Sequence, residues 1–261
     1  MTTGTTRSQD GSAGDVDYGA IGSGYSAHRR PDERIARFIA DALGGARTVL
    51  NVGAGTGSYE GAARTVTAVE PSRSMRDRRP AQLSPAIDAV AEDLPFADGE
   101  FDAAMTLFSV HQWSDARVGL REMRRVTRGP VVVLTCDPAL VREFWLHRYA
   151  PEVLDTEARR YPTVAELAAA LGGTGTVQTV PIPLDCTDGF NEAYYGRPEM
   201  LLDPAARQAC SAWSFVDDRV RERFDATLRR DLESGAWDGE FGHLRTQAAY
   251  QGSLVIVRAT P

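Results

Sequence analysis

Three glycines at alternate positions follow a short apolar run near the start of the chain. The run 48–52 is typical of a buried strand, and it leads directly into Gly53, Gly55 and Gly57. Closely spaced glycines let the backbone turn sharply and place no Cβ between the chain and a ligand. A second apolar run, 66–69, ends on Glu70, whose carboxylate can accept two hydrogen bonds from a ribose diol. Together these residues predict an α/β domain that binds a nucleoside cofactor.

The spacing differs from two other glycine-rich motifs that bind nucleotides. The dinucleotide fingerprint would place its third small residue at Ser58, and its acid follows about 20 residues on, whereas Glu70 comes sooner. A P-loop needs a lysine after its last glycine, and this chain contains no lysine. We therefore do not expect a nicotinamide oxidoreductase or a P-loop nucleotidase.

Motifs spread over about residues 18–136 carry a resemblance to one family. The short Gly-x-Gly-x-Gly form resembles motif I of the class I S-adenosylmethionine-dependent methyltransferases. Other segments resemble the ubiquinone/menaquinone-type (methyltransferase type 11-like) small-molecule branch of that family. They are Tyr25-x-x-x-x-Arg30-Pro31, Glu70-Pro71-Ser72-x-x-Met75, Ala91-Glu92-Asp93-Leu94-Pro95-Phe96 with Asp98-Gly99-x-Phe101-Asp102, and Val110-His111-Gln112-Trp113.

The resemblance implies a fold, a cofactor and a set of binding residues. The implied fold is α/β, with a Rossmann-like, seven-stranded, mostly parallel sheet whose last strand is antiparallel, and with a helical lid insertion. The implied cofactor is S-adenosyl-L-methionine, which leaves S-adenosyl-L-homocysteine as its product. The residues expected to bind it are Tyr25, Arg30, Gly53, Ala54, Gly55, Gly57, Glu70, Pro71, Met75, Ala91, Glu92, Leu107 and Phe108.

Some positions depart from the family pattern. The segment from Gly57 to Glu70 is short, so the helix between the first two strands is expected to have one or two turns. The acid that often meets the adenine amine falls on Val90, which leaves Asp88, Glu92 or a backbone carbonyl for that contact. Gln112 stands where many relatives have a second histidine.

His111 is the candidate catalytic residue, because it should lie beside the reacting methyl group. A histidine near its ordinary pKa is a natural general base for an acceptor hydroxyl. The alternative is a structural role, in which the ring binds the backbone or packs under the lid. The other histidines have no metal-like spacing to acidic residues, so no metal is expected.

Composition limits the classes of partner. The net charge of −7 and the pI of about 5.2 do not favour a nucleic-acid surface, which is normally basic. No apolar run approaches the roughly 20 residues that span a membrane. The cysteines are odd in number and far apart, which favours reduced thiols in the cytoplasm. We expect a monomer or homodimer that acts on a small-molecule acceptor.

The order of elements predicts two structural regions after a tail. Residues 1–15 are expected to be a disordered tail with no apolar signal-peptide segment. Residues 16–183 and 250–261 should form the cofactor-binding core, and 184–249 an aromatic-rich helical lid over the substrate. The expected strands of the sheet are 48–52, 66–70, 86–90, 101–107, 131–135, 177–182 and 250–258.

Three hypotheses for function follow from this pattern. The leading one is methyl transfer from S-adenosylmethionine to a small metabolite, at oxygen, nitrogen or carbon, as a tailoring step in specialised metabolism. The second is a non-methylating reaction, such as a cyclisation, on a scaffold that retains the cofactor. The third is a nonenzymatic protein that binds the cofactor.

Overall fold

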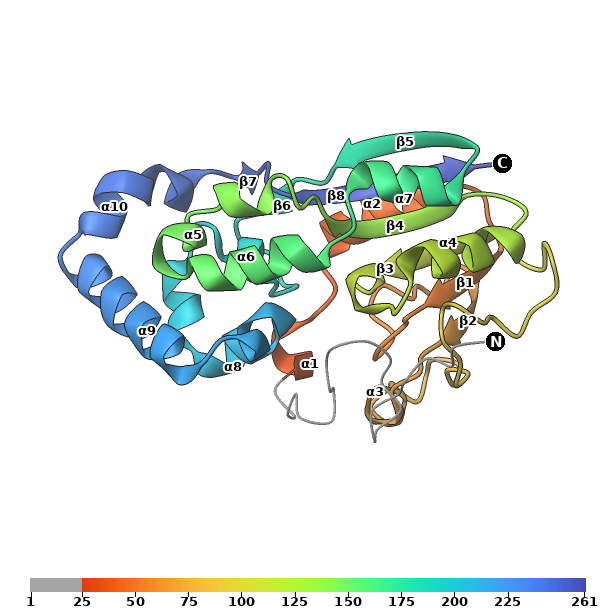
Figure 1. Cartoon of the computed structure of the whole chain (residues 1–261), viewed down its shortest axis with the longest axis horizontal. Helices are drawn as coiled ribbons and strands as arrows, with labels where there is room; N and C mark the ends of the chain where they lie inside the picture. Colours follow the sequence, from red (N-terminus) through yellow and green to blue (C-terminus); the bar gives the residue numbers. More distant parts are fainter. Residues whose placement is uncertain (1–24) are drawn as a thin grey trace.

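A twisted sheet with helices on both faces forms one end of the molecule, as the computed structural model shows for residues 25–261 (Figure 1). Its six strands, in the order β2-β1-β3-β4-β8-β5, are β2 (Thr65–Val69), β1 (Thr48–Val52), β3 (Ala103–Leu107), β4 (Val131–Cys136), β8 (Leu254–Thr260) and β5 (Thr174–Thr179). The first four strands pair in parallel, and β8 pairs antiparallel with both β4 and β5. The prediction of a mostly parallel Rossmann-like sheet with an antiparallel last strand is confirmed.

The prediction of a seventh strand over 86–90 is wrong. Only Ile87 pairs with β2, donating to Ala68 O at 2.8 Å and accepting from Glu70 N at 3.0 Å. Pro85, which has no N–H to donate, precedes this bridge, and the pairing does not extend. The main sheet of the described chain therefore has six strands.

Alternate residues of the central strands pack against helices on opposite faces of the sheet. The covering helices are α2 (Glu33–Leu43), α4 (Ala116–Arg125) and α7 (Val164–Leu171). Val132 and Leu134 share a buried cluster with α2, whereas Val131 and Val133 share a second cluster with α4 and α7. Strand β4 is buried on both faces, which explains its unbroken apolar sequence.

Local capping signals fix where these helices begin and end. Asp32 caps α2 by accepting from Arg34 N, and Gly44 ends the helix at a φ of 60°. Helix α7 begins with a capping box, in which Thr163 and Glu166 each accept from the other's backbone N–H. The buried apolar face of α2 packs against β4 and β8.

The last two strands of the main sheet, β5 and β8, differ from their predicted ranges of 177–182 and 250–258. Strand β5 begins earlier than predicted, at Thr174, and β8 begins later, at Leu254. Two short strands, β6 (Ile182–Pro183) and β7 (Ala249–Tyr250), pair in a separate two-stranded sheet. They join the main sheet to the helical part of the molecule.

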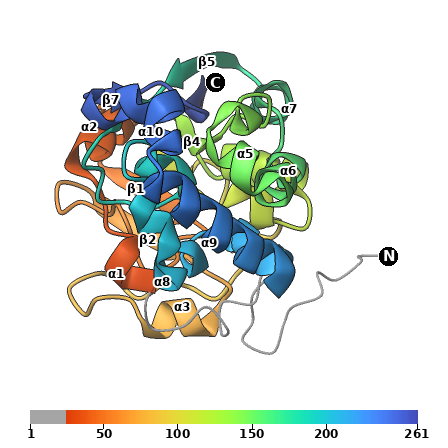
Figure 2. The same cartoon turned by 90° about the vertical axis from the view of Figure 1, so that its left-hand side faces the viewer.

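A cluster of helices occupies the other end of the molecule (Figures 1 and 2). Its α-helices are α1 (Tyr25–His28), α5 (Leu146–Tyr149), α6 (Pro151–Arg160), α8 (Pro204–Gln208), α9 (Asp218–Glu233) and α10 (Ala236–Phe241). Trp145 and Trp237 meet edge to face in its core, with ring centroids 5.6 Å apart. Helix α5 packs against α9, and α6 against the 3-10 turn at 211–215. The helices of the predicted lid, 184–249, thus pack on two helices that precede it; the predicted tail lies outside the described residues.

Candidate functional site

The three glycines after β1 all adopt the left-handed backbone conformation that favours glycine. Their φ angles are 69° at Gly53, 53° at Gly55 and 92° at Gly57. A Cβ added at Gly53 would lie 1.8 Å from Ser109 Oγ, so a side chain at this position would clash with Ser109. The segment after the loop forms turns rather than the predicted short helix, which leaves the backbone close to the ends of β1 and β2.

Glu70 lies at the end of β2, where two backbone N–H groups hold its carboxylate. Oε2 accepts from Gly55 N and Oε1 accepts from Ser72 N, both at 2.8 Å. Burial raises the pKa of this carboxyl, and the two hydrogen bonds oppose that effect. Because each carboxylate oxygen has a further lone pair, both can still accept a hydroxyl hydrogen bond.

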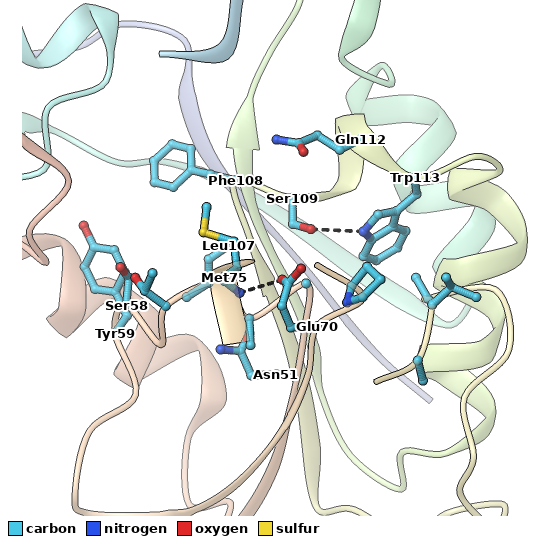
Figure 3. A pocket seen from close by; sticks show the side chains of 18 of the residues that line it. Asn51, Ser58, Tyr59, Glu70, Met75, Leu107, Phe108, Ser109, Gln112 and Trp113 are labelled. Carbon is cyan, nitrogen blue, oxygen red and sulfur yellow. Dashed lines mark hydrogen bonds between the residues drawn. The ribbon is translucent and has the colours of Figure 1, made fainter. Parts of the chain in front are cut away.

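A cavity of about 930 Å³, including the open solvent at its mouth, lies at the carboxyl ends of β1, β2 and β3 (Figure 3). This is the edge of an open α/β sheet where ligands bind. Ten of the thirteen predicted cofactor residues line it. They are Gly53, Ala54, Gly55, Glu70, Pro71, Met75, Ala91, Glu92, Leu107 and Phe108.

The remaining predicted residues lie elsewhere. Gly57 faces away, where an added Cβ would lie 2.3 Å from Leu83 Cδ1. Arg30 is exposed and lines a separate surface hollow. The side chain of Tyr25 lies outside the described part of the chain, although its backbone belongs to α1. His111 faces a neighbouring cavity.

Sequence reasoning missed an ion pair at the rim of the cavity. The Arg29 guanidinium donates to Asp188, and Tyr59 Oη donates to the same carboxylate at 2.8 Å. All three side chains line the cavity. Asp188 lies in the polar turn 185–190 of the predicted lid, but 159 residues separate it from Arg29, so no local spacing signals the contact.

The wall opposite Glu70 contains a strained residue and an ordered indole. Phe108, which follows β3, adopts a φ of 53°, a conformation that non-glycine residues rarely hold outside functional sites. Trp113 Nε1 donates to Ser109 Oγ at 3.0 Å, the contact drawn in Figure 3. The same Trp113 ring packs closely against Gly119 of α4, so α4 fixes this wall.

Two buried acceptor atoms belong to side chains that line the cavity. Within residues 25–261, no donor reaches Asn51 Oδ1 or Glu92 Oε2, although Glu92 Oε1 accepts from Asp115 N at 2.9 Å. Buried acceptors without donors are rare in folded proteins. Asp88, one of the groups considered for the adenine amine, instead pairs with Arg76 at 3.1 Å and does not line the cavity. Both buried atoms, Asn51 Oδ1 and Glu92 Oε2, can therefore accept hydrogen bonds from the N–H or O–H groups of a ligand.

A second cavity adjoins the first on the side of the helical cluster. Both are lined by Arg29, Phe108 and Gln112, and the second adds His111 and Tyr161. Burial, followed by the positive charges of Arg160 and Arg29, holds the pKa of His111 well below its ordinary value. The imidazole is therefore neutral near pH 7, with its Nε2 3.3 Å from the Gln112 amide nitrogen.

Metal-ligand clusters and membrane-spanning helices are both absent from residues 25–261. This part of the chain holds no cluster of three or more His, Cys, Asp or Glu side chains that could bind a metal ion. None of its helices combines the length and the apolar character needed to cross a bilayer. Cys136, Cys186 and Cys210 are buried free thiols.

Comparisons with known proteins match this geometry. The family model described as "Methyltransferase domain" matches residues 50–133. The demethylmenaquinone methyltransferase of Mycolicibacterium vanbaalenii is 32% identical over 152 residues, which cover 49% of this chain and 67% of that enzyme. The same enzyme of Renibacterium salmoninarum is 37% identical over 115 residues, which cover 38% of this chain and 46% of that one.

A solved structure extends the likeness to the helical cluster. A putative methyltransferase from an antibiotic biosynthesis pathway of Anabaena variabilis superposes with a TM-score of 0.83 at 27% identity. The match covers 90% of this chain and 100% of the other. The chain belongs to the class I S-adenosylmethionine-dependent methyltransferases, and its cofactor is S-adenosylmethionine.

Proposed function

We propose that this methyltransferase modifies a small metabolite in a tailoring step of specialised metabolism. The observation that carries the proposal is the pair of adjoining cavities, one at the glycine loop and Glu70, the other under the helical cluster. The putative methyltransferase of Anabaena variabilis, which superposes with a TM-score of 0.83, is described as part of an antibiotic biosynthesis pathway, and this supports a role in specialised metabolism. The net charge of −7 does not favour a nucleic-acid partner, and we propose a cytoplasmic monomer or homodimer.

The residues proposed to hold the cofactor divide by the part of it that they would contact. Glu70 would accept from the ribose hydroxyls, and Met75 would pack on the adenine. Glu92 is our choice for the adenine amine, because its buried Oε2 has no donor within the described chain. Leu107 and Phe108 would line the methionine part. The sulfonium supplies an activated methyl group when the cofactor is bound.

The protein's own contribution is to position the acceptor and exclude water. Holding two reactants in a reactive pose can lower a barrier by roughly 7–11 kcal/mol. The Arg29–Asp188 pair ties the segment before α2 to the helical cluster beside both cavities. The low pKa of His111 supports its structural and hydrogen-bonding role over that of a strong base.

The test is the mass of the product. Purified protein is incubated with methyl-labelled S-adenosylmethionine and extracts of candidate metabolites, and products are identified by mass spectrometry. A product one methylene heavier that carries the label supports the proposal. A product isomeric with its substrate would instead support the non-methylating alternative, and binding of the cofactor with no product from any extract would favour the nonenzymatic one.

A further inference from the structure

Strand β5 forms the outer edge of the main sheet, on the side farthest from the cofactor cavity (Figure 1). It pairs with β8 on one side, and no other strand of the described chain pairs with it. All residues of the strand, Thr174–Thr179, are exposed, and Val177 is 52% exposed. The edge of a strand carries N–H and C=O groups that can pair with a strand of another chain.

The hydrogen bonds to β8 determine which backbone groups of β5 face outward. In an antiparallel pair, opposite residues that exchange hydrogen bonds alternate with opposite residues that do not. Val180 N donates to Leu254 O at 2.9 Å, and these two residues continue the register of β5 and β8. The even-numbered residues of β5 therefore bond to β8. Gly175, Val177 and Thr179 direct their N–H and C=O groups toward the open edge.

This edge lacks the charged side chains and prolines that commonly keep strand edges from pairing. Residues 167–184 contain no charged side chain, although 25% of the residues in the whole chain are charged. Proline first follows β5 at position 181, beyond the end of the strand. The composition of this segment therefore favours a paired edge over an open one.

The open edge of β5 is complementary to a second copy of itself. When two copies run antiparallel with their Val177 residues opposite each other, Gly175 of each copy lies opposite Thr179 of the other. Every outward N–H group then meets an outward C=O group, because these are the residues that do not bond to β8. No like charges meet across the pair. The arrangement has the two-fold symmetry that is commonest among soluble homo-oligomers.

Helix α7 leaves room for this approach. Val177 lies opposite Val257, which belongs to the buried cluster under α7, so both copies of Val177 would lie on the α7 face of the joined sheet. The helix packs on β5 and β8, and its exposed residues Ala165 and Ala169 have small side chains. The charged side chain of α7, Glu166, is held in the capping box.

We propose that two copies of this chain pair through β5, in an antiparallel register centred on Val177, to form a homodimer with one continuous sheet. The cofactor cavities lie at β1, β2 and β3 of each copy, so this pairing leaves both of them open. The contact is narrow, and we expect a weak dimer whose population rises with concentration. The inference is independent of the proposed function, because its test measures association rather than activity.

The test is analytical ultracentrifugation of the full chain from low to high micromolar concentration. We expect the mean mass to rise from 28.4 kDa toward twice that value. Val177→Lys should remain monomeric throughout, because two ammonium groups would lie opposite each other. Leu140→Lys is the matched control, since Leu140 is also an exposed aliphatic residue, at 39%, but lies outside β5. It should associate as the unaltered protein does, and thermal melting checks the fold of both variants.

Cysteine variants test the register of the pairing. Opposite residues that exchange hydrogen bonds have Cα atoms about 5.5 Å apart, a separation that a disulfide can span. Val177→Cys should therefore form a disulfide-linked dimer under mild oxidation. Thr174→Cys, on the same exposed strand, should not, because the two copies of position 174 lie several residues apart in this register. The natural cysteines are buried and do not compete.

Several results would overturn the proposal. One is an unaltered protein that stays monomeric at every concentration, which would leave the edge free for a strand of another protein. Another is equal association of Val177→Lys and the unaltered protein, which would place the interface elsewhere. Equal cross-linking of Thr174→Cys and Val177→Cys would contradict the register and indicate non-specific contact.

Discussion

Gly53 offers a quantitative test of the glycine loop. In Gly53→Ala, the alanine backbone must keep the φ of 69° found at Gly53. This conformation costs about 1–2 kcal/mol for a residue with a side chain. It would also lie 1.8 Å from Ser109 Oγ and 2.7 Å from Ser109 Cβ. Forcing an extra methyl group into a packed site typically costs about 1–3 kcal/mol. The free energy of unfolding should therefore fall by about 2–5 kcal/mol.

Two other glycines separate the backbone contribution from the steric one. Gly55 has a φ of 53° but open space around its Cβ position, so Gly55→Ala should cost only about 1–2 kcal/mol. Gly61 has neither a positive φ nor a neighbour within 4 Å. Gly61→Ala should be neutral or stabilise by up to about 1 kcal/mol.

The assay is denaturant unfolding of the three variants under identical conditions. Adding Ser109→Gly to Gly53→Ala removes both clashing atoms, and the double variant should recover about 1–3 kcal/mol relative to the sum of the single changes. Equal costs for Gly53→Ala and Gly55→Ala, or no recovery in the double variant, would refute the packing of the loop against Ser109.

Three further predictions concern buried polar groups. Glu92→Gln should weaken S-adenosylhomocysteine binding in calorimetry by about tenfold, because it loses a hydrogen bond to a charged group. Asp88→Asn should leave the affinity unchanged. Similar losses of affinity in the two variants would remove Glu92 from the site. Burial raises the pKa of Glu192 from 4.5 to about 7. Between these pH values the folded protein therefore binds more protons than the unfolded chain does. Its free energy of unfolding should fall by about 3 kcal/mol as the pH rises through this range. Glu192→Gln should remove that fall in pH-dependent melts, and an unchanged slope would contradict the assignment. His111→Ala should reduce turnover less than the 10²–10⁴-fold expected of a general base; a larger loss, with a pH profile that changes with it, would restore His111 as the base.

The sequence predicted the parts of the fold and site that depend on local spacing. The three glycines and Glu70 lie close together in the chain, and their spacing alone requires a sharp turn beside a strand end. The capping box that starts α7 likewise depends only on neighbouring residues, Thr163 and Glu166. Of these residues, Gly53, Gly55 and Glu70 line the cofactor cavity.

Features that depend on distant contacts could not be predicted in this way. The Arg29–Asp188 pair joins residues 159 apart in the chain. From the sequence alone, the adjacent Arg30 is as plausible a residue of the site as Arg29. The apolar run at 86–90 was typical of a strand, but Pro85 and the single bridge at Ile87 end the pairing there. The low pKa of His111 comes first from its burial and then from the charges of Arg160 and Arg29, all of which depend on how distant segments pack.

The most direct test of the central claim is calorimetric titration with S-adenosylhomocysteine. Saturable one-to-one binding is predicted, weakened about 10- to 100-fold by Glu70→Gln, because hydrogen bonds to a charged group contribute about 1.5–3 kcal/mol. Glu222→Gln, an exposed change on α9, should bind as the unaltered protein does. No binding to folded protein at millimolar concentration, or equal affinity in Glu70→Gln, would contradict the account.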